Sequence, residues 1–255
     1  MTLKERTAAS FGFEWAKFND IFAEYEANFL SYIAPIDKDF FKGKLVLDAG
    51  CGAGRHSYFA AKYGASVVAI DLSEKSVQSA RDNLSDMDAH VIQSDICTFE
   101  HHRKFDYIFS IGVLHHLPDP QAGFNHLVTL LKEGGTISIW VYSKEDNWLA
   151  INFYEPIRKI TTRLPHKLLY YLSYIPALIV EICNRLKLPI FSYYIKFPFK
   201  TKLNDAFDVF SAPSARYYSL GDIYDWLLQA GLRDCHPHYR LLDGVIKGII
   251  GMGRK

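Results

Sequence analysis

The chain has 255 residues, enough to bury one full core and to carry an insertion as well. With 49% hydrophobic and 22% charged residues, its composition is that of a globular protein and excludes a disordered or fibrous chain. The formal net charge of +1 hides an asymmetry, because residues 150–202 contain nine Lys or Arg against two Glu. That segment carries +7, so the rest of the chain carries −6.

The N-terminus and the cysteines indicate the cellular compartment. The first 15 residues contain no apolar signal-peptide core, so we expect a cytoplasmic protein. The four cysteines are widely separated and form no Cys-x-x-Cys pair, which disfavours both a disulfide framework and a zinc site. We therefore expect reduced thiols and no bound metal.

The first predicted element is a long N-terminal helix within residues 1–40. Aromatic residues recur every three or four positions, which places them on one helix face. They are Trp15, Phe18, Phe22, Tyr25, Phe29 and Tyr32. Pro35 is predicted to end the helix. We interpret residues 1–40 as a helical lid: the stripe packs on the domain, or part of it covers a ligand, with Trp15 as a candidate substrate contact.

Residues 44–142 alternate between short apolar strands and amphipathic helices, a pattern typical of βαβ crossovers. Such units build a mostly parallel sheet with helices on both faces. The predicted strands are residues 44–48, 66–70, 89–93, 105–110 and 136–142, and the predicted helices are 54–63, 73–84 and 120–131.

The alternation stops after residue 142. Residues 148–205 contain several prolines and dense Leu, Ile and Tyr, and we interpret them as a cap of two or three inserted helices. Residues 206–255 are predicted to complete the sheet of this single domain, with a helix at 220–230 ended by Gly231 and a last strand at 245–252.

A glycine-rich loop follows the first predicted strand, in the sequence VLDAGCGAG at residues 46–54. Gly50, Gly52 and Gly54 let the backbone approach a ligand closely, and the helix that follows presents unpaired N–H groups. The dinucleotide fingerprint GxGxxG is absent, because Arg55 stands where its third glycine belongs. Asp48 beside the loop would repel a pyrophosphate and suits a cationic amino or sulfonium group.

Two further acids stand at strand ends. Asp71 ends the second strand, where a carboxylate can accept hydrogen bonds from both hydroxyls of a ribose. Asp95 and Ile96 follow the third strand, where an acid and an apolar neighbour can hold an adenine. Each acid alone could be a helix N-cap or a turn residue. Three of them around one glycine loop favour an adenosine-containing ligand.

The segments VLDAGCGAGRH, AIDLS, QSDIC, FDYIFSIGVLHHLPDP and LLKEGGTISIWVY resemble, in order and spacing, the motifs of class I S-adenosylmethionine-dependent methyltransferases of the ubiquinone-biosynthesis-like (type 11/12) group. The resemblance implies an α/β fold, a Rossmann-like doubly wound seven-stranded sheet that is mostly parallel, with its last strand antiparallel. It implies S-adenosylmethionine as cofactor and S-adenosylhomocysteine as product.

The same resemblance implies roles for individual residues. Gly50, Gly52 and Gly54 would lie under the methionine part of the cofactor, Asp71 on the ribose, and Asp95 with Ile96 on the adenine. Ser110, Ile111 and Gly112 would face the transferred methyl group. Asp48, Cys51 and Leu72 complete the predicted cofactor-binding set.

The reaction that follows is a direct displacement at the methyl group, in which the enzyme aligns the acceptor and excludes water. A general base is needed only where the acceptor must lose a proton. His115 and His116 are the candidate bases, because imidazole titrates near neutrality. The alternative is that they only shape the cofactor pocket.

The acceptor is the open question, and the cap allows three interpretations. It packs on the domain or on a second subunit in a homodimer; it covers a hydrophobic or anionic small-molecule acceptor, such as a lipid-, prenyl- or saccharide-linked metabolite; or residues 150–202 bind peripherally to the inner face of a membrane. Arg216, Tyr217 and Tyr218 are candidate acceptor contacts, or else parts of a packed loop.

Other functions are less well supported. Nucleic acid is disfavoured as a partner, because the net charge is near zero and the basic segment has the pattern of apolar helices. An RNA methyltransferase and a SAM-binding sensor or scaffold without transfer activity remain alternatives. The sequence lacks the glycine fingerprint of a nicotinamide-dependent enzyme.

Overall fold

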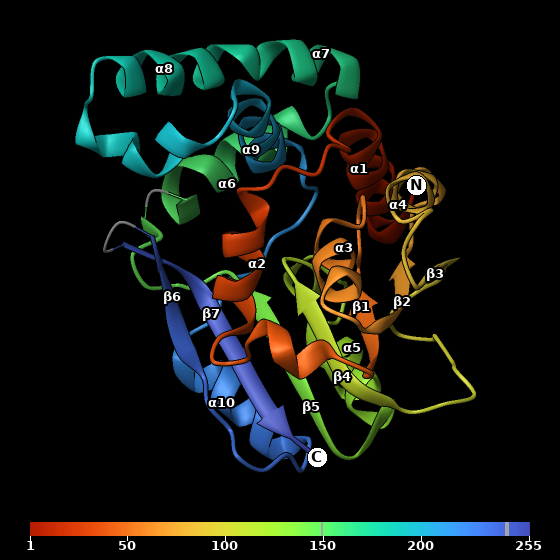
Figure 1. Cartoon of the computed structure of the whole chain (residues 1–255). Helices are drawn as coiled ribbons and strands as arrows, with labels where there is room; N and C mark the ends of the chain where they lie inside the picture. The colour runs from red at the N-terminus through yellow and green to blue at the C-terminus, as the bar shows by residue number, and fades with distance from the viewer. Residues whose placement is uncertain (149, 243–244) are drawn as a thin grey trace.

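The computed structural model describes residues 1–148, 150–242 and 245–255. At its centre lies a seven-stranded sheet (Figure 1). The strands are β1 (Leu45–Ala49), β2 (Ser66–Asp71), β3 (Ala89–Gln93), β4 (Phe105–Ile111), β5 (Leu131–Val141), β6 (His238–Leu242) and β7 (Val245–Arg254).

The strand order is β3-β2-β1-β4-β5-β7-β6. The first five strands are parallel, and β7 runs antiparallel to both β5 and β6. The predicted sheet is therefore confirmed, including the antiparallel last strand. Because the order reverses between β1 and β4, the carboxyl ends of these strands border a crevice suited to a ligand.

Helices cover both faces of the sheet, because side chains alternate between the faces along each strand. One face packs on α3 (Arg55–Lys62) and α4 (Glu74–Asn83) through residues such as Val46 and Tyr107. The other packs on α5 (Pro120–Thr129) and α10 (Leu220–Gln229) through residues such as Leu47. Short 3₁₀ turns η1 (Lys38–Phe41) and η2 (Leu114–His116) connect the layers.

The N-terminal segment forms two helices, so the prediction of one continuous helix was wrong. Helix α1 (Leu3–Lys17) begins at a capping box made by Thr2 and Glu5, and α2 (Tyr25–Ile33) follows after a loop. The aromatic stripe divides between two hydrophobic clusters. Phe18 is buried with residues of the cap, whereas Phe29 is buried against the sheet. One straight helix cannot reach both clusters, so the chain bends between them.

The cap contains more elements than the two or three helices predicted. They are the π-helix η3 (Ala150–Tyr154), α6 (Glu155–Thr161), α7 (His166–Leu172), α8 (Tyr174–Arg185), the 3₁₀ helix η4 (Pro189–Lys196) and α9 (Phe199–Ser211). The expected boundary at residue 205 falls inside α9, and residue 149 of the predicted range lies outside the described residues.

The cap has two levels. Helix α9 lies between the sheet and the outer helices, and α7 and α8 form the layer farthest from the sheet (Figure 1). Phe207 and Leu203 of α9 are buried together with Leu169 of α7 and Ala177 of α8. Within the described residues, no helix combines the length and the apolar composition required to cross a bilayer.

Candidate cofactor and acceptor site

The glycine loop between β1 and α3 adopts a conformation that favours glycine. Gly50, Gly52 and Gly54 have φ angles of 89°, 54° and 81°. A Cβ atom at Gly52 would lie 2.8 Å from the indole of Trp15. The backbone N–H groups of Gly50 and Cys51 donate to the carbonyl of Ile70, at 2.8 and 2.9 Å, and fix the loop to β2.

Two of the predicted acids lie around this loop, Asp48 buried and Asp71 half-buried. Asp48 accepts a hydrogen bond of 2.6 Å from Ser57 Oγ, and burial raises the pKa of Asp48 to about 7. Asp71 accepts hydrogen bonds from the backbone N–H of Gly52 at 3.0 Å and of Ser73 at 2.9 Å. Each carboxylate oxygen of Asp71 retains a second lone pair, so ribose hydroxyls can still be accepted.

Asp95 and Ile96 lie at the neighbouring strand end. The Asp95 carboxylate accepts the backbone N–H of Cys97 at 2.9 Å and pairs with Lys4 Nζ of α1. Ile96 is buried in the core on the α5 side of the sheet. Because β1, β2 and β3 are parallel, Asp48, Asp71 and Asp95 all lie along one edge of the sheet, as predicted.

Helix α1 covers this edge. It packs on α4 so closely that a Cβ atom at Gly12 would lie 2.2 Å from Ser73 Oγ. Lys4 therefore lies on Asp95, and Trp15 on Gly52, from one continuous helix. Trp15, a candidate substrate contact, lies on the glycine loop. The role of Lys4 had no sequence signal, because its partner is 91 residues away.

The residues predicted to face the methyl group lie at the carboxyl end of β4 and directly after it. Ser110 Oγ donates to the carbonyl of Ala49 at 2.8 Å and so links β4 to β1 within the sheet. Gly112 has a φ angle of 77°, and a Cβ there would lie 3.5 Å from Trp140. Ile111 pairs with Trp140 in the β4–β5 register. Trp140 therefore marks the place where a transferred methyl group is expected.

The two histidines lie side by side in η2, with ring centroids 4.1 Å apart. Among the described residues, neither ring nitrogen of His115 has a hydrogen-bond partner, and its ring lies 4.0 Å from that of Tyr142. His116 Nδ1 lies 2.5 Å from the carbonyl oxygen of Ser214 and therefore carries the proton. Burial lowers the pKa of His115 well below its usual value and that of His116 to about 4, so both rings are neutral at pH 7.

A group of buried and half-buried polar side chains, of which only His115 was predicted as a site residue, lies between α1, α9 and the carboxyl end of β5. We call it the polar cluster. It comprises Glu14, Arg55, His115, Trp140, Tyr142, Asn204 and Asp208. The cluster is continuous: Glu14 interacts electrostatically with Arg55 and Asp208, Tyr142 Oη lies 3.4 Å from Asp208 Oδ2, and the rings of Trp140, His115 and Tyr142 are in contact.

The polar cluster contains unpaired atoms at high density. Among the described residues, these buried atoms have no hydrogen-bond partner: Glu14 Oε2, Arg55 Nε, His115 Nδ1 and Nε2, Trp140 Nε1, Asn204 Oδ1 and Asp208 Oδ1. A buried polar atom without a partner costs about 1–3 kcal/mol, and in native proteins such atoms are rare. Their concentration beside the glycine loop indicates a site that binds polar ligands.

The predicted acceptor contacts separate in the structure. The ring of Tyr217 stacks on that of Tyr142 at 5.7 Å, and Tyr217 Oη donates to Glu155 Oε1 at 3.1 Å, so it borders the polar cluster. Arg216 donates to the carbonyl of Pro118 at 2.7 Å, and Tyr218 packs on Trp226.

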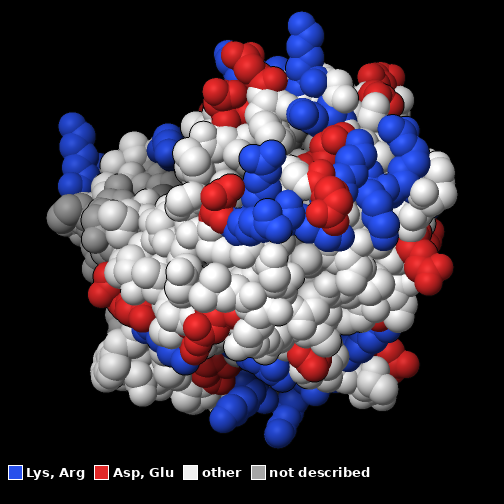
Figure 2. Space-filling view, turned by 90° about the horizontal axis from the view of Figure 1, so that it is seen from below, with Lys and Arg blue, Asp and Glu red and all other residues white. Residues whose placement is uncertain are grey.

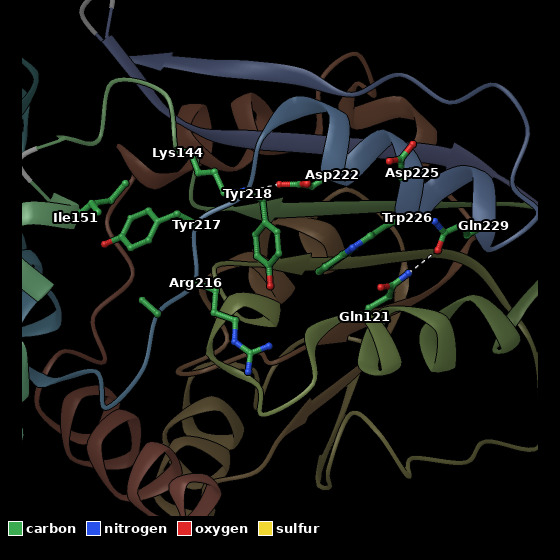
Figure 3. Close-up of a pocket in the computed structure, with 11 residues that line it drawn as sticks. Gln121, Lys144, Ile151, Arg216, Tyr217, Tyr218, Asp222, Asp225, Trp226 and Gln229 are labelled. Atoms are coloured by element: carbon green, nitrogen blue, oxygen red, sulfur yellow. Dashed lines mark hydrogen bonds and ion pairs between the residues drawn. The ribbon is translucent and has the colours of Figure 1, made fainter.

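Arg216 and Tyr218 instead line a cleft of about 830 Å³ between α5 and α10 (Figure 3). Tyr217 also lines this cleft, but its ring points away from the side chains of Arg216 and Tyr218. Gln121 donates to Gln229 across the cleft at 2.9 Å. The cleft is lined by helix and loop side chains and contains none of the three strand-end acids.

In the described part of the chain, no group of three or more His, Cys, Asp or Glu residues is placed to hold a metal ion. The four cysteines are free thiols.

Comparisons with known proteins agree with this geometry. Residues 46–135 match the profile of a family described as a methyltransferase domain. Residues 46–135, about a third of the chain, are therefore similar to a methyltransferase domain. The matched residues include the glycine loop, Asp71 and Asp95, and they end within β5.

The curated relatives match only part of the chain. The ubiquinone biosynthesis O-methyltransferase of Coxiella burnetii is 34% identical over 105 residues, which are 38% of this chain and 42% of that enzyme. The enzyme of the same name from Thiobacillus denitrificans is 36% identical over 104 residues, 39% of this chain and 43% of its own length. The chain thus matches less than half the length of either relative.

Solved structures share the fold over the whole chain. The magnesium protoporphyrin IX methyltransferase of Synechocystis PCC 6803, crystallised with bound S-adenosylmethionine, is similar with a TM-score of 0.62. The similarity covers 100% of this chain and 98% of that one at 16% identity. This likeness confirms the fold, including its seven-stranded sheet.

Proposed function

We propose that this chain transfers a methyl group from S-adenosylmethionine (SAM) to a small-molecule acceptor. The observation that carries the proposal is the convergence of the glycine loop, three strand-end acids and the polar cluster at one edge of the sheet. When bound, SAM supplies an electrophilic methyl group on a sulfonium. The residues present fit it, because Asp71 can accept ribose hydroxyls and the unpaired polar atoms lie next to the loop.

Calorimetric titration with S-adenosylhomocysteine (SAH) tests the cofactor site. We expect wild-type protein to bind and Asp71→Asn to bind at least tenfold more weakly, because a hydrogen bond to a charged group contributes about 1.5–3 kcal/mol. Asp106→Asn is the matched control. Its carboxylate also accepts a strand N–H, from Leu45 at 2.8 Å, but at the opposite edge of the sheet. Equal weakening by both variants would contradict the assignment of Asp71.

Methyl transfer itself separates an enzyme from a SAM-binding sensor or scaffold. Radiolabelled SAM is incubated with the protein and a cell extract, which is then divided into small-molecule, RNA and protein fractions. We expect label in the small-molecule fraction. Tight SAH binding without label in any fraction would favour the sensor, and label confined to RNA would favour the RNA methyltransferase alternative.

We propose further that the outer layer of the cap binds to a membrane surface and so gives access to a hydrophobic acceptor. Large apolar side chains are exposed on the cap, including this outer layer, to an extent unlike the rest of the molecule. Of the twenty that are exposed in the described residues, sixteen lie between Trp148 and Ile195. On α8 they form one stripe, at Ile175, Leu178, Ile179, Ile182 and Leu186. Exposing an apolar face of this kind to water costs free energy, whereas an interfacial helix buries such a face in the lipid.

Exposed basic side chains on the cap favour anionic lipid as the partner of this apolar face. Lys159, Arg163, Lys167 and Lys187 are exposed on the cap, and within the described residues no carboxylate forms an ion pair with them. Each contributes about 1 kcal/mol near an anionic bilayer. The end of the molecule opposite the cap differs, because acidic and basic side chains lie intermixed there (Figure 2).

Flotation with vesicles tests the membrane proposal. We expect binding to vesicles of phosphatidylcholine with phosphatidylglycerol, and weaker binding to phosphatidylcholine alone. Replacing Ile175, Ile179 and Ile182 together by Ser should abolish flotation without changing SAH binding, because all three are at least half exposed. Leu228→Ser on α10, which is 49% exposed, is the control.

Absence of flotation with both lipids would overturn the membrane proposal. Sedimentation of the same variants tests whether a second copy of the chain, instead of a membrane, covers this face. A dimer that the triple variant dissociates would show that a second copy of the chain covers it. The homodimer and the cytoplasmic location both remain predictions.

A further inference from the structure

We propose that Glu14 and Asp208 form a carboxyl pair that shares one proton and binds a hydroxyl group of the acceptor, with Asp208 taking the proton of that hydroxyl during methyl transfer. The inference rests on the proposed methyl transfer and adds to it the acceptor class and the base. Neither residue belongs to a motif of the methyltransferase domain, because Glu14 precedes residues 46–135 and Asp208 follows them.

The two carboxyl groups lie on helices that are in contact, because Ser10 Oγ of α1 donates to the carbonyl of Ser211 of α9 at 2.8 Å, one helical turn from Glu14 and from Asp208. Glu14 lies in the last turn of α1 with 1% of its surface exposed, and its Oε2 has no hydrogen-bond partner. Asp208 lies on α9, and its Oδ1 is likewise buried and unpaired, while its Oδ2 lies 3.4 Å from Tyr142 Oη. Both side chains therefore hold an oxygen that is removed from solvent and free to bind a ligand.

The position of the pair suits the acceptor rather than the cofactor. Tyr142, which contacts Asp208, follows β5 two residues after Trp140, and Trp140 pairs with Ile111 at the end of β4. The resemblance to the family places the transferred methyl group at Ile111 and Gly112. Asp208 therefore lies at the carboxyl end of β5, the neighbour of β4, whereas Asp71 and Asp95 follow β2 and β3 on the other side of β1.

The charges around the pair favour one proton shared between the two carboxyls. The groups that face it are Arg55 from α3, Arg158 from α6, Tyr142 after β5, Tyr217 next to it, and Asn204 and Asp205 from α9. Both arginines have other partners. Arg55 donates to the carbonyl of Phe18 at 2.9 Å, and Arg158 pairs with Glu155 at 2.5 Å.

The pKa values of the two carboxyls differ accordingly. Burial, and then the negative charge of Asp208, raise the pKa of Glu14 well above its usual value. Burial raises the pKa of Asp208 to about 6, against the lowering effect of Arg158. Burial therefore favours the protonated form of Glu14 more strongly than that of Asp208. Two buried carboxyls with separated pKa values are a common arrangement for acid and base roles.

A hydroxyl group complements such a pair. The neutral Glu14 carboxyl donates a hydrogen bond and the Asp208 carboxylate accepts one, and a hydroxyl can do both. An alkyl amine is protonated at neutral pH and offers no lone pair, whereas an anionic group would add a second negative charge beside Asp208. The acceptor expected here is an alcohol or phenol whose reacting end is neutral, on a body that can be hydrophobic.

The transfer step balances with this pair as proton acceptor. The acceptor oxygen forms a bond to the methyl carbon, and the carbon–sulfur bond breaks with its electron pair passing to sulfur. The hydroxyl proton moves to a carboxylate oxygen of Asp208. A base is most effective when its pKa lies near the working pH, so Asp208 is better suited than His116, whose pKa burial lowers to about 4.

Two measurements test the pair. With radiolabelled SAM and the small-molecule fraction of a cell extract, we expect Asp208→Asn to lower kcat at least 100-fold, since general bases contribute about 10²–10⁴-fold. SAH binding should change less than twofold, and Asp106→Asn should behave as wild type. The wild-type rate should rise with pH through about 6, and this dependence should disappear in Asp208→Asn.

Infrared spectra of the SAH complex provide a readout independent of turnover. At pH 7 we expect a band from a protonated carboxyl that is lost in Glu14→Gln and kept in Asp208→Asn. A spectrum unchanged in Glu14→Gln overturns the shared proton, and near-normal turnover in Asp208→Asn overturns the base. A product methylated on nitrogen, identified by mass spectrometry, overturns the acceptor class. Failure of wild-type protein to bind SAH would instead contradict the proposed function.

Discussion

At the scale of single residues, the cofactor loop depends on glycine for two separate reasons. Gly52 has a φ angle of 54°, which costs other residues about 1–2 kcal/mol, and it also lies against the indole of Trp15. The first reason follows from the strand–loop–helix pattern in the sequence. The second depends on a helix that lies far away in the chain.

We predict that Gly52→Ala weakens SAH binding by at least tenfold, because the new Cβ displaces Trp15 from the loop. Gly231→Ala is the matched control, since Gly231 has a φ angle of 75° and no atom lies within 4 Å of the added Cβ. Both variants should lose about 1–2 kcal/mol of unfolding free energy in urea denaturation. Unchanged SAH affinity in Gly52→Ala would show that Trp15 has no part in the site.

The buried carboxyl group of Asp48 makes the stability of the protein depend on pH. Its pKa is raised to about 7 by burial, so between about pH 4 and 7 the native state holds this proton more tightly than the unfolded chain. Stability therefore falls as pH rises through this window, by roughly 4 kcal/mol for this group. Asp48→Asn removes the contribution. Urea denaturation at pH 4.5 and 7.5 should show a clearly smaller loss in the variant, and parallel losses in both proteins would contradict the prediction.

At the scale of elements, the sequence patterns were reliable where packing is local. The strands and helices of residues 44–142 were predicted close to their observed bounds, because each strand pairs with neighbours of the same type and each helix packs on one sheet face. The N-terminal helix was predicted wrongly, since its break between Lys17 and Tyr25 depends on two clusters built by distant residues. The cap was predicted as helical, but not its division into six short elements.

Helix α8 is held to α9 by a buried ion pair. Lys202 Nζ, which is 5% exposed, donates to Glu181 Oε2 at 2.7 Å, and Arg185 Nε donates to Glu181 Oε1 at 2.9 Å. We predict that Lys202→Ala destabilises the protein by about 1–3 kcal/mol in urea denaturation, because Glu181 keeps only one partner. Arg185→Ala removes the exposed partner of the same carboxylate and should cost less than about 1 kcal/mol. Equal losses would contradict the role of burial.

At the scale of the whole molecule, α1 closes the edge at which the sheet presents its acids. Contacts from Lys4 to Asp95, from Gly12 to Ser73 and from Trp15 to Gly52 extend along this edge. Because α1 adjoins the loop, the acids and Glu14 of the polar cluster, a ligand that enters there must pass beneath it. Helix α1 is therefore the element expected to open first.

Hydrogen exchange measures this opening. We predict that the amides of α1 exchange faster than those of β4 and β5 in the free protein, since local opening takes less free energy than global unfolding. Saturating SAH should slow exchange in α1, and at 100 times its dissociation constant it should stabilise the whole domain by about 2.7 kcal/mol. Exchange in α1 as slow as in β5 without ligand would contradict a mobile lid.

The sequence by itself determined six of the seven strands, the glycine loop and the three strand-end acids, because these depend on local periodicity and on the rule that parallel strands end at one edge. Strand β6 had no predicted counterpart. The tertiary structure alone decided which side chains meet across the chain. It placed Lys4 on Asp95, Glu14 near Asp208 and Tyr217 on Tyr142, and it separated Arg216 and Tyr218 from that site. Such contacts join residues far apart in sequence, and no local pattern encodes them. The physical reason is that burial changes the chemistry of a carboxyl group, and burial is a property of the packed molecule.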